Sequence, residues 1–547
     1  MKGILISLLF ISQLTFAQRL KKADRKIVED LKRNIGYLAD DKLEGRRAGT
    51  PGEKLAYEYI SNQFKSAGLE PKGENGYYLQ EFEINDGKQI NPGTLFRVNE
   101  TALYPGKDFI PLAFSPNSPL IEAAVAVSLS EKGVPWFKDL DPVLENNQNN
   151  PHFDLEQYIK IEASQAAQKG ARALVLYNTS NIPDKISFEK KDRSPAAPIP
   201  VLYLTKTAKE KYFKDESATY DVKIKVDIGE SKRTGHNVVG YINNNASSTV
   251  IIGAHYDHLG YGEDGNSMLH TGERLIHNGA DDNASGTAAL IELANLLSKA
   301  KAKDNNYLFI AFSGEELGLF GSKYFTEHPT IDLANTNYMI NMDMVGRLND
   351  SSKTLTIGGY GTSPVWSSAL YSEKKIPFTI KIDSSGTGPS DHTSFYRKDI
   401  PVLFFFTGIH SDYHKPTDDA NKINYTGEMR IIRYIYGLIG NLNSIGKISF
   451  TKTREQPSSS PSRFSVTLGI MPDYTFSGTG VRVDGVSDGR PAQKAGLKTG
   501  DIITQLGDFH VSSLENYMEA LSKFKKGDST KVKIKRGNEE KLFDISF

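Results

Sequence analysis

Cysteine is absent from the 547 residues, and this absence excludes several kinds of chemistry. The chain has no disulfide bridges, thiolate zinc fingers, cysteine nucleophiles or lipidated cysteine anchors. The sequence also lacks an excess of charge, since 66 basic and 66 acidic side chains give a formal net charge of zero. This balance argues against nucleic-acid binding driven by positive charge and against a highly charged disordered protein. Any bound metal must be held by His, Asp or Glu.

Long hydrophobic runs are also lacking. Residues 1–17 contain Lys2 and an apolar run from Ile4 to Phe16, followed by Ala17 and Gln18, which is the layout of a secretory signal peptide. This run is too short for a spanning helix, and no later stretch approaches about 18 consecutive apolar residues. We therefore expect an exported protein, periplasmic or secreted, without a transmembrane anchor. A buried N-terminal helix or an uncleaved anchor is the alternative.

Length and patterning predict several domains. At roughly 150 residues per domain, the chain should hold about three or four. From Gly235 onward, short apolar strands alternate with helical patterns. This predicts an α/β fold with a mostly parallel central sheet flanked by helices. Apolar residues at helical spacing between Ala23 and Gly68 predict two more helices, joined by the turn segment LEGRRAGTPGE.

Two β-rich segments lie outside this α/β unit, one inserted in it and one after it. A stretch rich in Ser, Pro and charge precedes the second and is typical of a linker. The predicted order is a signal peptide (1–17), a core in two parts (24–105 and 236–448) interrupted by a β-rich insert (106–235), a linker (449–463) and a C-terminal unit (464–547).

Polar side chains occur at five places at or just beyond the ends of the predicted strands. Open α/β sheets bind their ligands at this edge. Taken singly, each place has an ordinary structural explanation, such as a helix cap or a solvated face. Five of them in one α/β unit indicate a shared site. The residues are His255 and Asp257, Asp281 and Asp282, Glu315 and Glu316, Asp343, and His414.

This set suits divalent metal ions. Imidazole and carboxylate ligands without thiolates favour hard or borderline cations, and zinc is the usual choice when imidazole is present. Two ions about 3.5–4 Å apart, joined by a bridging carboxylate, can polarise a carbonyl and generate a bound hydroxide at neutral pH. The pair Glu315 and Glu316 can divide the work, one ligating metal and one accepting a proton from water.

The segments HYDH, GADDNASG, SGEELGLFGS, NMDMVG, SDHTSF and YHKPTD resemble the zinc-dependent exopeptidase family of bacterial leucine-type aminopeptidases, carboxypeptidase Q and glutamate carboxypeptidase. The resemblance implies two zinc ions per chain and a cis peptide bond after the bridging Asp, here Asp282-Asn283. It also implies a role for each residue: His255 and Asp343 on one ion, Glu316 and His414 on the other, Asp282 between them, Glu315 as general base and Asp257 as the partner of His255.

One departure concerns the residue that stabilises the oxyanion. Some family members carry a tyrosine just before the SDH segment, where this chain reads SSGTGPSDH. Other members use a tyrosine immediately before the last ligand histidine, and Tyr413 has that position. We expect Tyr413 to stabilise the tetrahedral intermediate, with a merely packed tyrosine as the alternative. The remaining nearby histidines are expected to be structural or pocket-lining, namely His258, His270, His277, His392 and His410.

The two β-rich segments carry weaker resemblances. The insert is similar to a protease-associated (PA) domain, chiefly through QAAQKGARALVLYN, and would either wall the substrate cleft or only pack against the core. The C-terminal unit resembles a PDZ domain through SVTLGIMPDY and GVSDGRPAQKAGLKTGDIITQLGD. Such a domain would bind a peptide C-terminus or a protein partner by strand addition. A degenerate unit that only packs is the alternative.

The resemblance favours a secreted or periplasmic di-zinc metallo-aminopeptidase, a metalloprotease that hydrolyses N-terminal residues from peptides. A dipeptidase or carboxypeptidase on the same metal core is the closest alternative, since specificity depends on loops outside the motifs. The complete ligand set argues against a single-zinc glutaminyl cyclase. A catalytically dead, receptor-like peptide-binding protein would have lost a site residue, and none is missing.

Overall fold

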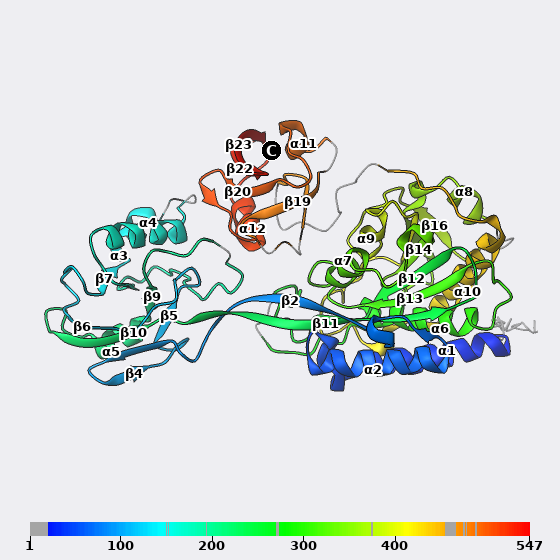
Figure 1. Cartoon of the computed structure of the whole chain (residues 1–547), viewed down its shortest axis with the longest axis horizontal. Coiled ribbons are helices and arrows are strands. Elements are labelled where there is room, and N and C mark those ends of the chain that lie inside the picture. Colours follow the sequence, from blue (N-terminus) through cyan, green and yellow to red (C-terminus); the bar gives the residue numbers. More distant parts are fainter. Residues whose placement is uncertain are drawn as a thin grey trace, which may run out of the picture.

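The computed structural model describes residues 20–148, 150, 153–192, 194–269, 273–372, 376–453, 466–473, 476, 478–486 and 489–547. They form three bodies, which Figure 1 shows as a large α/β body, a β-rich body at the far end of a long ribbon, and a small body built from the C-terminal residues. The predicted signal peptide and most of the predicted linker lie outside the described residues.

A nine-stranded sheet forms the centre of the α/β body. Every residue of its three central strands is buried, as expected for parallel strands covered on both faces. The predicted mostly parallel sheet is confirmed, with antiparallel pairs toward its edges. The parallel strands are β13 (Asn306–Phe312), β12 (Thr249–His255), β14 (Thr336–Met342) and β17 (Val402–Phe406), flanked by β11 (Ile228–Ile242), β1 (Glu70–Pro71) and β2 (Leu79–Ile90) on one side and by β15 (Thr354–Gly358) and β16 (Thr379–Ile382) on the other.

Helices cover both faces of this sheet, because alternate strand residues enter two different hydrophobic clusters. The two helices predicted near the N-terminus are confirmed, and the second begins at a Thr50 side-chain cap with Pro51 in its first turn. One face carries α1 (Lys22–Leu38), α2 (Pro51–Ser66), α6 (Gly286–Leu297), α8 (Trp366–Ala369) and α10 (Tyr425–Leu442), and the other carries α7 (Phe320–Glu327) and α9 (His392–Tyr396).

The β-rich body contains two four-stranded sheets. The long strands β2 and β11 pair antiparallel and form the ribbon that joins this body to the central sheet (Figure 1). The strands at residues 95–98 and 101–103 pair within this body, although the predicted boundary at residue 106 assigns them to the core. One sheet has the strand order β4 (Thr101–Leu103), β3 (Leu95–Val98), β10 (Tyr220–Lys225), β6 (Ile121–Val125). The other has the order β5 (Phe109–Pro111), β9 (Val201–Leu204), β8 (Leu174–Tyr177), β7 (Trp136–Asp139). The helices of this body are α3 (Asp141–Asn147), α4 (Leu155–Gln168) and α5 (Lys206–Tyr212).

The C-terminal body has its own antiparallel sheet and its own hydrophobic core. This body contains the helix α12 (Leu514–Ser522), and a shorter helix, α11 (Pro491–Ala495), precedes it. The strands are β18 (Ile470–Pro472), β19 (Val481–Val486), β20 (Ile502–Leu506), β21 (Phe509–His510), β22 (Ser529–Arg536) and β23 (Glu539–Ser546).

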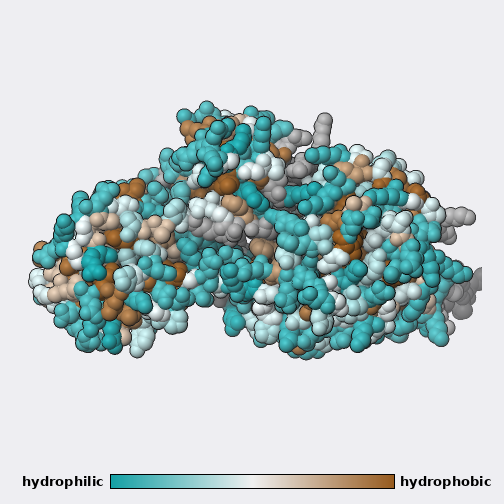
Figure 2. Space-filling view, in the orientation of Figure 1, coloured by the Kyte–Doolittle hydropathy of each residue, from teal (hydrophilic) through white to brown (hydrophobic). Residues whose placement is uncertain are grey.

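The C-terminal body contacts both of the others. Lys323 Nζ on α7 lies 2.8 Å from Asp473 Oδ1, and Ser512 Oγ donates to Asp192 Oδ1 of the β-rich body at 3.0 Å. Hydrophilic residues predominate on the face of the three bodies shown in Figure 2, and apolar residues gather there in small patches. Among the described residues, no helix has the length and apolar content needed to cross a membrane.

Glu292 on α6 is an acidic side chain inside the apolar α/β body. It is 3% exposed, and its Oε1 has no hydrogen-bond partner among the described residues. Burial, followed by the charge of Asp30, raises the pKa of Glu292 to about 7, while Lys26 and Arg33 act in the opposite sense. The carboxyl group is therefore neutral in the folded protein at mildly acidic pH.

We expect the protein to lose stability as the pH rises from about 4.5 to about 7, because the unfolded chain releases the Glu292 proton first. The raised pKa corresponds to a loss of about 3 kcal/mol. Glu292→Gln should therefore differ little from the wild type near pH 5 and unfold at a higher temperature near pH 8, as measured by scanning calorimetry. Glu29→Gln, exposed on α1, is the control. Identical unfolding temperatures of Glu292→Gln and the wild type near pH 8 would contradict the prediction.

Candidate metal centre

The predicted site residues come together at the carboxyl ends of the parallel strands. His255 is the last residue of β12, Glu316 lies in the loop after β13, and Asp343 directly follows β14. The loops before α6 and after β17 bring in Asp282 and His414. Because the carboxyl ends of neighbouring parallel strands meet at one sheet edge, these five residues share one location. Their side chains are at most 14% exposed.

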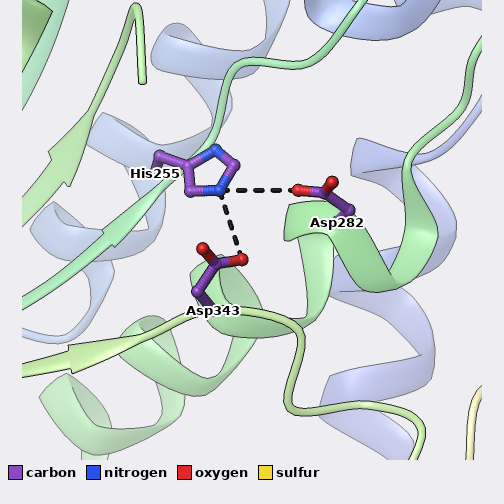
Figure 3. Close-up of side chains that lie close together, drawn as sticks. All are labelled: His255, Asp282 and Asp343. Atoms are coloured by element: carbon purple, nitrogen blue, oxygen red, sulfur yellow. Dashed lines mark ion pairs between the residues drawn. The ribbon is translucent and has the colours of Figure 1, made fainter. Parts of the chain in front are cut away.

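One group of ligands forms around His255, as Figure 3 shows. Its Nε2 lies 3.5 Å from Asp282 Oδ1 and 3.3 Å from Asp343 Oδ1. The two carboxylates approach the same ring nitrogen from different elements, since Asp282 lies in the π-helical turn that precedes α6 and Asp343 directly follows β14. The three side chains can therefore surround a single cation.

A second group forms around His414 and shares a member with the first. His414 Nε2 lies 3.2 Å from Glu316 Oε2 and 3.3 Å from Asp282 Oδ2. The two oxygens of Asp282 thus face two different histidines, since Oδ1 is directed toward His255. This is the geometry of a carboxylate that bridges two ions.

The separations fit tetrahedral zinc. Ligands about 2.0–2.2 Å from a zinc ion at tetrahedral angles lie about 3.3–3.6 Å from each other. The four nitrogen-to-oxygen distances run from 3.2 to 3.5 Å. Asp343 Oδ1 is buried and has no hydrogen-bond partner among the described residues, although His255 Nε2 is near. A donor set of two imidazoles and three carboxylates suits zinc as well.

Groups behind the two histidines orient the rings. His255 Nδ1 lies 3.2 Å from the Asp257 carbonyl and 3.7 Å from Asp257 Oδ1. His414 Nδ1 lies 2.8 Å from the Asn266 carbonyl. Because a carbonyl only accepts, each Nδ1 carries the proton and each Nε2 presents its lone pair to the site. Asp257 therefore stands behind His255, where the resemblance expects it.

The adjacent residues Glu315 and Glu316 have different surroundings. Burial raises the pKa of Glu315 well above its ordinary value, although His255, whose Nε2 is 3.9 Å away, opposes this shift. Burial acts on Glu316 as well, but His414 and His258 outweigh it and hold the pKa of Glu316 well below its ordinary value. One carboxyl group thus favours holding a proton and the other stays ionised, a division typical of acid–base sites.

His258 is a site residue that sequence reasoning assigned only to a structural or pocket-lining role. It is fully buried, and its Nδ1 lies 2.7 Å from Glu316 Oε1 and 4.0 Å from Asp282 Oδ1. These three residues also satisfy the distances of a metal-binding group. The contact of 2.7 Å has hydrogen-bond length, shorter than the separation of two ligands on one ion. The His258 ring therefore makes a hydrogen bond that orients Glu316, whereas His414 Nε2 lies at the separations expected between ligands of one ion.

Asp281 and Asp282 differ in orientation, although they are neighbours in the chain. Asp281 Oδ1 accepts from the Gly346 backbone N–H at 2.7 Å, and Asp281 Oδ2 lies 3.1 Å from His410 Nε2. Both carboxylate oxygens of Asp281 therefore contact other protein groups, whereas those of Asp282 face His255 and His414. The predicted cis peptide bond between Asp282 and Asn283 is confirmed.

Tyr413 stacks on His414, with ring centroids 3.9 Å apart. Burial, followed by the charges of Asp282 and Glu316, raises the pKa of Tyr413 far above its ordinary value, so the hydroxyl stays protonated and can donate. His414 itself has a φ of +53°, an uncommon backbone conformation for a residue other than glycine. Such conformations occur where the surroundings fix a functional side chain.

The other histidines make contacts away from the shared carboxylate. His277 Nε2 lies 2.7 Å from Ser267 Oγ, and the His392 ring stacks on Phe404 with centroids 4.5 Å apart. Burial lowers the pKa of His392 to about 3, so its ring is neutral. His270 lies outside the described residues.

Two separate segments of the chain match known protein families. Residues 237–439 match the sequence model of Peptidase family M28, and residues 447–547 match that of a PDZ domain. The first match contains all seven predicted site residues. The chain is therefore similar to a peptidase domain of this family over its central part and to a PDZ domain over its C-terminal part.

Curated relatives and solved structures extend this likeness at modest identity. Aminopeptidase YwaD of Bacillus subtilis is 27% identical over 393 residues, which are 69% of this chain and 77% of that protein. Leupeptin-inactivating enzyme 1 of Streptomyces exfoliatus is 29% identical over 227 residues, which are 40% of this chain and 50% of that enzyme. The solved aminopeptidase from Aneurinibacillus sp. strain AM-1 is 24% identical. The match covers 80% of this chain and 100% of that chain, with a TM-score of 0.40.

Arg46 holds the loops that carry the site, although sequence reasoning placed it only in a turn segment. It is fully buried and donates to the carbonyls of Tyr256 at 2.8 Å, Asn278 at 2.6 Å and Gly279 at 3.0 Å. Tyr256 adjoins the first ligand histidine, and Gly279 lies three residues before the shared aspartate. Burial lowers the pKa of Arg46 to about 10, so the guanidinium remains charged near neutral pH.

Arg46→Lys should lower the free energy of unfolding by about 2–4 kcal/mol, because a lysine keeps the charge but leaves buried carbonyls without donors. Calorimetric unfolding of the metal-free protein measures the loss. Arg25→Lys, on the exposed side of α1, should change it by less than about 0.5 kcal/mol. Equal losses in the two variants would show that the carbonyl contacts contribute nothing.

Proposed function

We propose that this chain, an M28 peptidase domain followed by a PDZ domain, is a zinc-dependent metallo-aminopeptidase that removes N-terminal residues from peptides. The observation that carries the proposal is the buried Asp282 carboxylate, whose oxygens lie 3.5 Å from His255 Nε2 and 3.3 Å from His414 Nε2. Aminopeptidase YwaD, which matches 69% of this chain, is named as an aminopeptidase, and this supports the reaction class.

We assign two zinc ions to the site. His255 and Asp343 would hold one, Glu316 and His414 would hold the other, and Asp282 would be shared by both. Bound zinc in such a pair polarises the carbonyl of the scissile bond and lowers the pKa of a water molecule. The chain contributes the burial that excludes bulk water and the hydrogen bonds that fix each ligand.

Glu315 is the residue that we assign to proton transfer. Its carboxylate accepts a proton from the attacking water and donates it to the departing amine. Burial raises the pKa of Glu315, which favours holding the proton between the two steps. Tyr413, beside His414, is assigned to donate a hydrogen bond to the oxyanion. Asp257 keeps the ring of His255 in place.

Two alternatives use the same residues. A dipeptidase or carboxypeptidase would select a different end of the substrate, and a receptor-like protein would bind peptides without cleaving them. The second alternative is disfavoured because no site residue is missing or turned away. The seven residues present are His255, Asp257, Asp282, Glu315, Glu316, Asp343 and His414. We also propose export, on the signal-peptide layout of residues 1–17.

The full chain should remove single residues from the N-terminus of a peptide with a free amine and leave the same peptide intact when it is N-acetylated. Products are identified by mass spectrometry, and bound zinc is counted by elemental analysis. A chelator should stop the reaction, and about two zinc ions per chain are expected. Trimming of both peptides from the C-terminus would replace this assignment with carboxypeptidase.

Glu315→Gln is the matched variant in that assay. It should keep both zinc ions and lose turnover by about 10²–10⁴-fold, because it removes the proton acceptor without removing a ligand. Full activity in this variant would refute the assignment of Glu315 as the base. Absence of cleavage by the wild type despite bound zinc would favour the receptor-like alternative.

We also propose that the PDZ domain binds the C-terminus of a peptide or partner protein. β18 is an edge strand of its sheet, so an extended peptide can pair with it. The loop that contains Leu468 and Gly469 leads into this strand at Ile470, and Gly469 has a φ of +75°. We assign this loop to the peptide carboxylate.

A pool of random peptides with free C-termini should be retained by immobilised Glu315→Gln protein, and the C-terminally amidated pool should pass through. Gly469→Ala should reduce retention, because a Cβ there would lie 2.2 Å from Arg490 Cβ. Gly489→Ala, with a similar φ of +74° but open space around it, is the control. Equal retention of both pools would remove this proposal.

A further inference from the structure

The loop after β12 makes hydrogen bonds to two residues of the metal centre, His414 and Glu316. The Asn266 carbonyl accepts from His414 Nδ1 at 2.8 Å, and the Met268 backbone N–H donates to the His414 carbonyl at 2.8 Å. The Asn266 side-chain amide donates to the Glu316 carbonyl at 3.2 Å. Both ligands of the second group therefore depend on where this loop lies.

The loop has little regular structure of its own to fix its position. It contains no helix or strand between the end of β12 and residue 269. Gly262 and Gly265 have φ values of +84° and +81°, which other residues rarely adopt. A segment of this kind is positioned by the side chains that tie it to neighbouring elements.

Asp264, between these two glycines, makes the strongest such tie. Arg47 donates to both of its oxygens, at 2.7 and 2.9 Å, in a two-pronged contact. Arg233 on β11 approaches the same oxygens at 3.2 and 3.4 Å. The three side chains are 6–14% exposed, so solvent screens the contact little.

We propose that Asp264 is a positioning residue of the metal centre. Arg47 and Arg233 fix its carboxylate. Because Asn266 follows two residues later, the same contacts also restrict the position of the Asn266 backbone. The Asn266 carbonyl then fixes the ring orientation and tautomer of His414. The inference rests on the zinc function proposed above.

The charge state of Asp264 agrees with this role. Burial alone would raise its pKa, but the hydrogen bond from Arg47 and the charges of Arg233 and Arg47 outweigh burial and lower the pKa of Asp264. The carboxylate therefore stays ionised throughout the range in which a zinc peptidase operates, and the contact does not open with pH there.

Asp86 provides a matched control. It faces the same two arginines, with Arg233 at 2.9 Å and Arg47 at 3.5 Å, and is comparably buried. It lies on the ribbon strand β2 and not in the loop that leads to Asn266. Asp86→Asn removes the same charge from the same place and leaves the loop anchored, whereas Asp264→Asn weakens the anchor.

The test measures stepwise zinc affinity of the full chain by competition with a chromophoric chelator, together with calorimetric unfolding of the metal-free proteins. Asp264→Asn should bind one of the two zinc ions about 10–100-fold more weakly and the other within about twofold of the wild type. Asp86→Asn should keep both affinities within about twofold. Arg47→Lys, which keeps the charge but loses the two-pronged contact, should weaken the same single ion and serves as the second variant if Asp264→Asn does not fold.

The outcomes separate this inference from the function on which it rests. A wild type that binds fewer than two zinc ions overturns the proposed function and this inference together. A wild type with two ions and unchanged affinities in Asp264→Asn, or in Arg47→Lys when that variant is the one measured, overturns this inference alone. Equal weakening in Asp86→Asn, or equal weakening of both ions, also overturns it, because the effect would then be one of charge or of general structure.

Discussion

The centre depends on the carboxylate of Asp282. Its two oxygens lie between His255 and His414, which are far apart in the sequence. Around it, the side chains of Glu315, Glu316 and Asp343 are only 6–13% exposed, so that several carboxylates share a small volume with little water. Such a cluster repels itself unless cations or protons balance it. The two zinc ions proposed above would balance this charge and would also supply the chemistry. The rest of the domain can be understood as the means of holding these groups together.

Charged side chains position the loops around the site. Arg46 donates to carbonyls on two sides of the centre, and Asp418 Oδ2 accepts the backbone N–H groups of Asp281 and Asp282 at 2.9 and 3.0 Å. Asp264 ties the loop behind His414 to two arginines. Loops at the edge of a sheet have no ladder of backbone hydrogen bonds to position them. Charged groups with several hydrogen bonds replace that ladder, and they hold ligand positions that a metal requires to within fractions of an ångström.

The three bodies meet beside these supports. A cavity of about 100 Å³ is lined by Asp86, Arg233 and Asp264 on one side and by Asp473 of the PDZ domain on another. Asp473 also contacts Lys323 on α7, a helix that begins four residues after Glu316. The ribbon of β2 and β11, which carries Asp86 and Arg233, joins the β-rich body to the same place. The PDZ domain thus packs against the elements that support the metal centre, and not on a remote surface of the peptidase.

The sequence by itself determined the parallel sheet, the two N-terminal helices and the strand-end residues from His255 to His414, because each depends on local periodicity and on motif spacing. The resemblance of GADDNASG to the exopeptidase motif implied Asp282, and not its neighbour Asp281, as the shared carboxylate. Only the tertiary structure decided the supporting contacts. Arg46 meets Tyr256 across 210 residues of sequence, Asp264 meets Arg47 across 217, and the pairing of β3 and β4 with the β-rich body depends on a strand more than a hundred residues later. A local pattern reports which side of an element is apolar, whereas the partner of a buried charge is set by how distant segments pack.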